Sequence, residues 1–302
     1  MMMLRALLFF PATVVALACV PAHAHEEEPA LPLTITSHNE QGNVRKIVVR
    51  LIGNEVEITA EVTNRTKSKK SIGFAAYTPF FKAPEVAEDN HEKDFRSLKV
   101  TIDAAAVKIH TERRAFLLGN DITQELRKAG VPVLPSVETV THSRNWRGLP
   151  IDGWNGFVAL SWIPSFAPNS TSTQVIRYRA LPQFGRDELN SPRFERTISQ
   201  HCGDVREVQK SLATQVPGIE YLMFDRYEIP ITFLQSQEVR IDVTQFVKAG
   251  EAKRPLQALT CGTIDRKGEG ANFTATLASP ETTLSILVIS SFPGSVVEKA
   301  AK

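Results

Sequence analysis

The sequence predicts a mainly β fold, with two β-sandwich-like domains into which short capped helices are inserted. Short runs such as Glu55–Val62 alternate apolar and polar side chains, and this period of two is typical of half-buried strands. Turn residues such as Gly53-Asn54 separate the runs, and helical patterns are few. Many short strands with turns between them favour a β-sandwich over a parallel α/β sheet.

Residues 1–24 have the pattern of a secretory signal peptide. One positive charge in Met1–Arg5 precedes the apolar run Ala6–Val20, and Ala22-His23-Ala24 is a small-x-small cleavage site. We expect cleavage after Ala24 and export to the periplasm or the exterior. His25 would then be the first residue of the mature chain.

The leader also bears on attachment to a membrane. A lipoprotein signal would use Cys19 as the acylated residue, although the leucine two positions before it fits that signal badly. No later run is both long and apolar enough for a membrane span, which takes about 20 residues. The sequence therefore predicts an exported protein with no transmembrane segment once the leader is removed.

Residues 25–181 are expected to form an N-terminal β-sandwich domain. Its helix is predicted near residues 122–129, where Asp121 is the N-cap and Gln124 completes a capping box. Gly130 suits the position that follows the last turn of that helix. Strands are expected over residues 45–51, 55–62, 71–77, 95–102, 106–110, 154–162 and 174–180.

Residues 182–302 are expected to form a β-rich C-terminal domain. Glycine, aspartate, asparagine and proline gather between residues 181 and 192, which predicts a linker there. A helix is predicted near residues 205–213, with Asp204 as its N-cap and Glu207 three residues later. Strands are expected over residues 227–233, 238–243, 256–261, 272–278 and 282–290.

Two cysteines, Cys202 and Cys261, follow the leader, and we predict that they form one disulfide. Disulfides form and persist outside the cytoplasm, and two cysteines allow one connectivity. Cys202 stands just before the predicted second helix and Cys261 at the end of a predicted strand, so the bond would hold the C-terminal domain together. The alternative is a pair of buried free thiols.

Several motifs occur along the chain in a characteristic order and spacing. They are Val62–Lys70, Glu112–Leu117, Gly119–Thr123 with Leu126, Phe166-Ala167-Pro168 with Val175 and Tyr178, Cys202 with Asp204, and Cys261-Gly262. Together they resemble the motifs of an uncharacterised family of exported bacterial proteins, the domain of unknown function 4424. The resemblance implies export, a bacterial source and a β-rich fold, and it supplies no catalytic residues.

Two departures from the family's pattern stand out. The glycine-rich start of the mature chain is absent, and Leu234–Gln237 replaces a TGANW stretch of the family. His201 also stands where the family has a tyrosine before the first cysteine. If either missing stretch marks a functional surface, this chain lacks it.

Charge and motifs exclude several function classes. The chain has 35 basic and 33 acidic residues, and such a balance argues against a nucleic-acid partner, which needs a clustered basic face. The sequence has no metalloprotease, redox-dithiol, P-loop or serine-hydrolase elbow motif. We therefore expect no cofactor and assign no catalytic residue.

One metal hypothesis rests on the expected mature N-terminus. His25 would offer its free amine and its ring nitrogen together, and this pair suits copper. A histidine from the body of the protein would have to complete the site. The alternative is that His25 belongs to a flexible acidic N-terminal segment that binds no metal. The histidines available are His38, His91, His110, His142 and His201.

The sequence as a whole favours a binding or assembly module of the bacterial periplasm or exterior, with a protein partner in the envelope or outside the cell. Sandwich loops and sheet edges are the surfaces such proteins use. The alternatives are a secreted hydrolase acting on envelope or extracellular polymers, and a periplasmic copper-binding protein that uses His25. A serine within reach of a histidine would favour the hydrolase.

Overall fold

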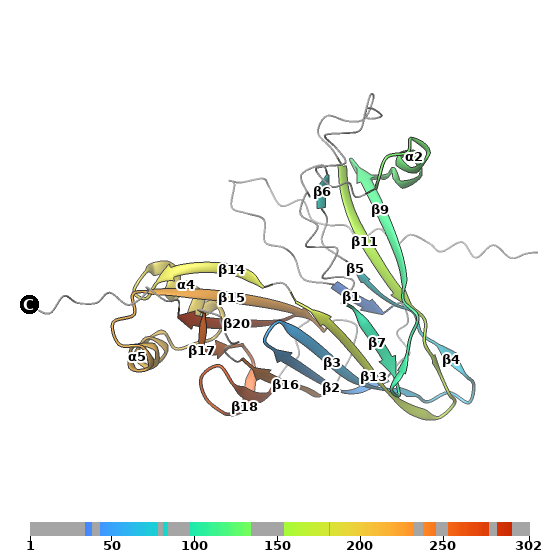
Figure 1. The fold of residues 1–302 in the computed structure, drawn as a ribbon. Helices are drawn as coiled ribbons and strands as arrows, with labels where there is room; N and C mark the ends of the chain where they lie inside the picture. The colour runs from blue at the N-terminus through green and yellow to red at the C-terminus, as the bar shows by residue number, and fades with distance from the viewer. Residues whose placement is uncertain are drawn as a thin grey trace, which may run out of the picture.

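The computed structural model confirms the mainly β class: several sheets and three short helices make up the described residues (Figure 1). The chain carries 302 residues. The structure describes residues 34–37, 43–77, 81–83, 97–133, 154–180, 182–231, 238–245, 253–277 and 283–291. None of the described helices has the length and apolar character that a membrane-spanning helix needs.

Sheet B, with eight strands, forms the base of the molecule in Figure 1. Its strand order is β18-β19-β16-β2-β3-β13-β7-β8. The alternation predicted for Glu55–Val62 is observed, because Val56, Ile58, Ala60 and Val62 are buried on one face. The strands are β2 (Asn43–Ile52), β3 (Glu55–Asn64), β7 (Lys99–Ile102), β8 (Ala105–Ala106), β13 (Ser170–Arg179), β16 (Glu238–Thr244), β18 (Thr263–Lys267) and β19 (Phe273–Leu277).

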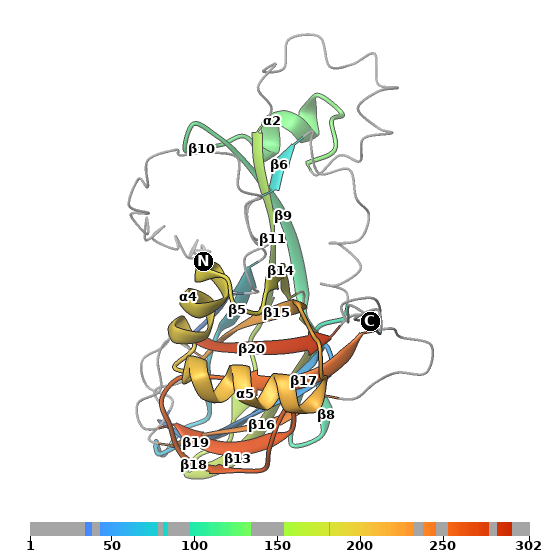
Figure 2. The ribbon, with the colours of Figure 1, turned by 90° about the vertical axis from the view of Figure 1, so that its left-hand side faces the viewer.

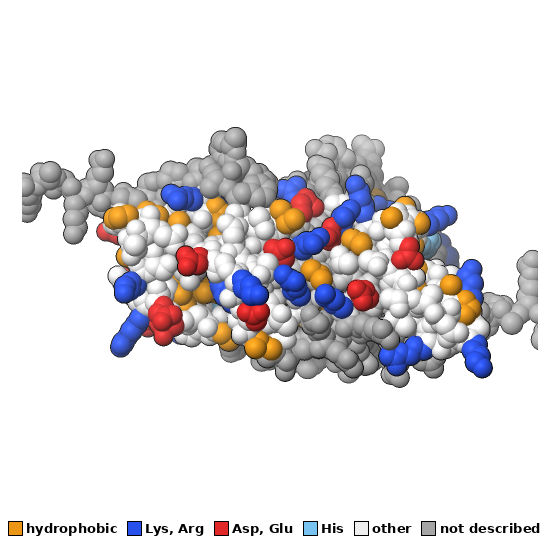
Figure 3. All heavy atoms as spheres, turned by 90° about the horizontal axis from the view of Figure 1, so that it is seen from below, with side chains coloured by type: hydrophobic (Ala, Val, Ile, Leu, Met, Phe, Trp, Pro, Cys, Tyr) orange, Lys and Arg blue, Asp and Glu red, His pale blue; other side chains and the backbone are white. Residues whose placement is uncertain are grey.

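The outer face of sheet B is polar. A row of paired residues crosses four strands there, and ion pairs join Arg50 to Glu57 (2.9 Å) and to Asp242 (3.8 Å), and Arg177 to Glu57 (2.6 Å). Figure 3 shows basic and acidic side chains interspersed on this face. Burial opposes the ionisation of Glu57, but hydrogen bonds from Arg177 and Arg50 outweigh it and lower the pKa of that carboxyl.

Sheet A packs over one end of sheet B and then extends beyond it. Its order is β1-β5-β11-β9-β10, with β6 also paired to β11. The strands are β1 (Thr34–Ser37), β5 (Phe74–Tyr77), β6 (Phe81–Ala83), β9 (His110–Leu117), β10 (Asn120–Asp121) and β11 (Trp154–Trp162), and helix α2 (Thr123–Lys128) follows β10. We call β9, β10, α2 and the start of β11 the arm, which rises away from the body in Figures 1 and 2.

Sheet D has four strands in the order β14-β15-β20-β17 and lies over the other end of sheet B. Two helices cover its outer face (Figure 2). The strands are β14 (Gln183–Glu188), β15 (Tyr221–Pro230), β17 (Arg254–Leu259) and β20 (Thr283–Ser291), and the helices are α4 (Pro192–Gln200) and α5 (Val205–Gln215). A small ribbon, β4 (Lys70–Ser71) with β12 (Ser165–Phe166), closes the far end of the body.

The main core lies between sheet B and the two sheets that cover it. One face of sheet B supplies Ile58 and Ile241, sheet A supplies Trp162, and sheet D supplies Tyr227 and Ile286. A second core fills the space between sheet D and its helices and includes Phe194, Ile198, Leu212, Leu222 and Ile289. Strands β15 and β20 therefore contribute alternate residues to two cores, which makes sheet D the middle layer.

Strands from both sides of residue 181 share sheet B. β16 pairs with β2 in parallel, from Glu238 opposite Lys46 to Thr244 opposite Ile52. The turn after β2 adds further contacts, because Gly53 N–H donates to the Thr244 carbonyl (2.9 Å). The division of the chain at residue 181 stays a prediction, but the two halves are hydrogen-bonded across it.

Asn54, in the same turn, joins sheet B to sheet D. Tyr227 of β15 donates its hydroxyl proton to Asn54 Oδ1 at 2.7 Å, and the Asn54 carbonyl accepts from Ala180 N–H at 2.8 Å. Burial raises the pKa of Tyr227, so the phenol is a neutral donor at ordinary pH. One short turn thus holds the end of β13 and the middle of β15 in place.

Two local predictions fail and one is confirmed. The segment between residues 181 and 192 contains strand β14, which pairs with β15 along its whole length. The Asp121 capping box is wrong: Ile122 occupies the N-cap of α2, and Asp121 Oδ1 accepts from Thr123 N–H in a turn before the helix. The helix expected from 205 to 213 is confirmed as α5, whose Glu207 N–H donates to Asp204 Oδ1.

We predict that Tyr227→Phe lowers the free energy of unfolding by about 0.5–1.5 kcal/mol, because it leaves Asn54 without its donor. Urea unfolding measures the change. Tyr221→Phe is the matched control, since Tyr221 also donates its hydroxyl proton, but to the exposed Glu188. Equal small losses in the two variants would mean that the Tyr227 bond does not tie the sheets.

Candidate functional site

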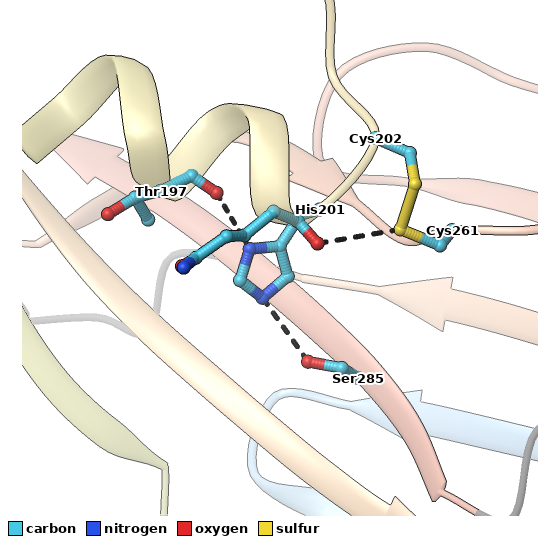
Figure 4. The surroundings of a disulfide bond; sticks show 6 residues. Thr197, His201, Cys202, Cys261 and Ser285 are labelled. Carbon is cyan, nitrogen blue, oxygen red and sulfur yellow. Dashed lines mark hydrogen bonds between the residues drawn. A yellow bond between two sulfur atoms is a disulfide. The ribbon is translucent and has the colours of Figure 1, made fainter.

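The predicted disulfide between Cys202 and Cys261 is present (Figure 4). The sulfur atoms lie 2.14 Å apart and the Cα atoms 5.1 Å apart. Cys202 follows α4 with a φ of +57°, and Cys261 follows β17. Gly203 is required here, because a Cβ atom on it would lie 2.7 Å from Ile198 and 2.9 Å from Leu259. The disulfide therefore fixes the end of α4 directly against the end of β17.

His201, beside the disulfide, is the centre of a buried polar cluster. Its ring is 3% exposed, Nδ1 lies 2.8 Å from the Thr197 carbonyl, and Nε2 lies 3.2 Å from Ser285 Oγ. Ser285 donates to Glu228 Oε1 at 2.9 Å, and Arg226 Nε donates to the same oxygen at 2.5 Å. The cluster joins the last turn of α4 to β15 and β20.

The Thr197 carbonyl fixes the tautomer of His201. A carbonyl can only accept, so Nδ1 carries the proton and Nε2 of the neutral ring presents a lone pair to Ser285. Burial lowers the pKa of His201, and Arg226 lowers it further, while the Thr197 carbonyl and Glu228 act in the opposite direction. The neutral ring is therefore the folded form at pH 7.

This cluster contains the serine–histidine contact that a hydrolase needs, but it is not arranged as a nucleophile. Ser285 has one hydroxyl proton, and Glu228 Oε1 at 2.9 Å competes for it with the lone pair of His201 Nε2 at 3.2 Å. The imidazole is buried beneath α4, whereas Ser285 and Glu228 on its Nε2 side are partly buried. The geometry instead fits a structural polar network, which fixes the end of α4 on sheet D.

The tip of the arm is the second candidate site, because a leucine occupies a turn position that usually holds asparagine, aspartate or glycine. β9 and β10 are joined by the two-residue turn Leu118-Gly119, flanked by the pair Leu117 and Asn120. Both turn residues have positive φ, +49° for Leu118 and +83° for Gly119. Such turns favour asparagine or aspartate at the first position. Leu118 is also 94% exposed, so neither backbone nor burial favours a leucine there.

A small core of its own supports this tip. Ala115, Leu126, Val131, Val133 and Trp154 pack together between the strands and α2. Trp154 Nε1 donates to the Val133 carbonyl at 2.9 Å, and Val131 N–H donates to the Leu126 carbonyl at 2.9 Å after Gly130 at φ +69°. The turn thus stands on a packed support.

The motif residues of the chain serve the fold. Asn64 accepts from Thr66 N–H (3.0 Å) and donates to the carbonyls of Phe166 (3.2 Å) and Ala167 (2.9 Å). It therefore ties the loop after β3 to the loop after β12. Thr123 Oγ1 accepts from Ala115 N–H at 2.9 Å in the arm.

The sequence profile of the domain of unknown function DUF4424 matches residues 36–190, which is half of the chain. The chain belongs to this family. The motifs Asn64–Thr66 and Gly119–Thr123 lie inside the matched DUF4424 region, and both make hydrogen bonds that shape loops. The matched region ends after β14, so the strand that pairs with β14 lies outside it.

No curated protein sequence matches this DUF4424 chain. Two solved structures resemble it distantly. A protein from Legionella pneumophila, described as a candidate nutrient binding protein, is 11% identical with a TM-score of 0.38, covering 86% of this chain and 70% of that one. Yeast LTA4 hydrolase in complex with bestatin is 10% identical with a TM-score of 0.37, and the match covers 89% of this chain but 31% of the enzyme. Such TM-scores assign neither fold nor activity.

The histidine hypothesis is not decided by the structure. His25 lies outside the described residues, as do His38, His91 and His142. His110 is exposed at the start of β9, and His201 is engaged in the cluster above. Within the described ranges, no group of three or more His, Cys, Asp or Glu side chains is placed to hold a metal ion. The copper site at His25 stays a prediction.

Sequence reasoning missed Leu118 and the His201 cluster. Leu-Gly is not among the residue pairs that indicate a two-residue hairpin, so the sequence carries no clear signal for the turn at Leu118. No sequence signal brings Ser285 and Glu228 to His201, because these residues come from separate strands. Only the pairing of β15 with β20 places them together.

Removing the disulfide should cost about 4 kcal/mol of unfolding free energy in the chain-entropy model, because it closes a loop of 59 residues. Urea unfolding of the double variant Cys202→Ser/Cys261→Ser measures the loss. Intact-mass analysis of the unreduced protein should show neither sulfur alkylated. Alkylation of both without reductant would disprove the bond.

The lowered pKa of His201 predicts a loss of stability in acid. As pH falls below 6.5, the ordinary value, the unfolded chain binds the proton before the folded chain does. The contribution of neutral His201 to the free energy of unfolding is therefore complete above pH 6.5. It decreases as the pH falls from 6.5 toward the lower pKa of the folded chain. We expect His201→Gln to lose less unfolding free energy than the native chain between pH 7.5 and about 5 in urea titrations. Identical losses would show that His201 is not the group that titrates.

Proposed function

We propose that this protein is an exported binding or assembly module of the bacterial periplasm or exterior, and that the tip of its arm contacts a protein partner. The observation that carries the proposal is Leu118, a fully exposed leucine in a left-handed turn position. The resemblance of the motifs to those of exported proteins and the pattern of residues 1–24 support export. His25 would begin the mature protein.

Leucine at position 118 does not stabilise the fold. A left-handed conformation costs a non-glycine residue about 1–2 kcal/mol, and exposure of the side chain gives nothing back. Positions that break local rules without a folding gain are the ones at which function is expected. A partner that takes the leucine into an apolar pocket would supply the missing gain.

The surroundings of Leu118 suit a protein surface with a polar rim. Behind the turn, Arg114 pairs with Glu112 (3.1 Å) and with Asp121 (3.9 Å), and the Glu112 hydrogen bond raises the pKa of Arg114. Arg127 and Lys128 end helix α2 beside it. An apolar point within a ring of mixed charge is the usual composition of a protein interface.

The proposal predicts that stability and binding respond to Leu118 in opposite directions. Leu118→Asn creates the favoured Asn-Gly turn, so the free energy of unfolding should rise by about 0.5–1 kcal/mol. The same change should remove the contact with the partner. Urea unfolding measures the first effect.

Crosslinking in the native envelope measures the second effect. A photo-reactive residue at Asn120, which is exposed next to the turn, should give one defined protein adduct, and Leu118→Asn should reduce it at least about tenfold. The same photo-reactive residue at Ile264, which is 67% exposed on β18, is the control and should not give that adduct. Mass analysis of the recovered bait also tests whether it begins at His25. An adduct that is unchanged in Leu118→Asn would refute the proposal.

A further inference from the structure

The edges of the sheets are not equally protected, and β14 is an open edge six residues long. Unpaired edge strands tend to associate with other strands unless they are very short, bulged, or carry proline or charged residues, lysine above all. β8 and β10 have two residues each, and β18 has a bulge near Asp265 and ends at Lys267. At the other border of sheet D, β17 has a bulge and Pro255. The six residues of β14 include three charged side chains, Arg186, Asp187 and Glu188, but the strand has no proline, lysine or bulge and pairs with β15 without a register shift.

The free backbone groups of β14 can be identified from its pairing. Leu189 N–H donates to the Glu220 carbonyl at 2.8 Å, in register with β14 and β15. Donors alternate along a strand, so residues 183, 185 and 187 direct their backbone groups at β15, and Phe184, Arg186 and Glu188 direct theirs at the open edge.

At both ends of this edge, backbone N–H groups are either already hydrogen-bonded or absent. Glu188 N–H already donates to Asp187 Oδ1 at 2.9 Å, and the Glu188 carbonyl accepts from Ser191 N–H at 3.1 Å. At the other end, Pro182 has no N–H to offer. The groups that remain open belong to Phe184 and Arg186, which are placed symmetrically about Gly185.

We propose that β14 pairs antiparallel with β14 of a second copy of this chain, with the two-fold axis at Gly185. In this register Phe184 of each copy lies opposite Arg186 of the other, and a pair of backbone hydrogen bonds forms on each side of the axis. The two four-stranded sheets become one continuous sheet, and β14, the outer strand of sheet D in Figure 1, becomes an inner strand.

The side chains of β14 complement one another in this register alone. Phe184 is 63% exposed, and a guanidinium placed over its ring makes a cation–π contact. Gln183 lies opposite Asp187, a donor opposite an acceptor. Shifting the register two residues one way places Arg186 against Arg186, and shifting it the other way places Arg186 against Pro182, so both alternatives lose the complementarity.

The two side chains that would meet beside the axis already make cation–π contacts within sheet D. Lys253 Nζ lies 5.5 Å from the Phe184 ring centroid and Arg186 Cζ lies 4.7 Å from that of Tyr221, so both side chains are already held on sheet D. A ribbon this short buries less than a standard interface of about 1,200 Å² or more, so the dimer should be weak and form in the micromolar range. The inference is independent of the arm.

A charge swap tests the register. Phe184→Arg places two cations opposite each other, and Arg186→Glu removes the cation from the ring, so each should weaken dimerisation at least about tenfold in sedimentation equilibrium. The double variant Phe184→Arg/Arg186→Glu sets Arg opposite Glu and should restore the dimer. Unchanged thermal midpoints and far-UV spectra check that all three variants fold.

A cysteine at the axis tests the geometry directly. Opposed residues without mutual hydrogen bonds have Cα atoms about 4.5 Å apart, within the range of a disulfide. A Cβ atom on Gly185 makes ordinary contacts of 3.7 and 3.8 Å with Phe224, so Gly185→Cys should fold. In a Cys19→Ser background it should crosslink to a dimer under mild oxidation, and Ile264→Cys, the exposed control, should not.

The proposal would be overturned by a monomer at about 100 µM, by a dimer that the edge substitutions leave unchanged, or by a Gly185→Cys chain that crosslinks no faster than the control. Binding of another protein's extended segment at β14, with the chain alone monomeric, would also overturn it, since the occupant would then not be a second copy.

Discussion

The parallel pairing of β2 with β16 is the contact on which the other parts of the structure depend. It joins residues 46–52 to residues 238–244, and the greater part of the chain lies between these two strands in sequence. Without it, β18 and β19 have no sheet to extend, and the Gly53-Asn54 turn loses its bond to Thr244. Loop closure over such a distance is unfavourable, so the pairing has to be supported by burial on sheet B, where Val49 and Ile241 are almost inaccessible.

Sheet D converts that platform into a three-layer body. Its strands give one face to the core on sheet B and the other to α4 and α5, and the disulfide and the His201 cluster fix the end of α4 between them. These polar and covalent contacts are structural, and they leave two surfaces unexplained by folding. One is the turn at Leu118, carried on the arm, and the other is the open edge of β14. They face different partners in our account, a foreign protein and a second copy.

Features that depend on neighbouring residues, such as strand alternation and helix caps, could be predicted from the sequence. The strand expected from 154 to 162 is β11 to the residue, because alternation and buried tryptophans mark both ends. Asp204 caps α5 and the two cysteines pair, as their types and spacing require. β14 was taken for a linker because an edge strand exposed on most sides needs no apolar alternation. Helix α4 was missed although Ser191 caps it and Pro192 begins it, since the same residues are turn formers.

Contacts between strands that are distant in the sequence could not be predicted from such patterns. Nothing in the sequence of β2 indicates that its partner lies 192 residues further along the chain, where Glu238 pairs with Lys46. Parallel pairing of distant strands involves no connecting turn that a local pattern could reveal. Asp121 was expected to cap a helix because it stands three residues before Gln124, but the hairpin at Leu118 shifts the helix start and leaves Asp121 in a turn. The family match explains why the motifs recur without assigning chemistry, since Asn64 and Thr123 stabilise loops.

Native-state hydrogen exchange tests the central pairing most directly. If β2 and β16 form one cooperative unit, the amides of Val49 and Ile241 should exchange only through global unfolding, with equal free energies that match urea unfolding. Exchange of Ile241 through a smaller opening, while Val49 stays protected, would show that the C-terminal strands leave sheet B independently and would contradict the account.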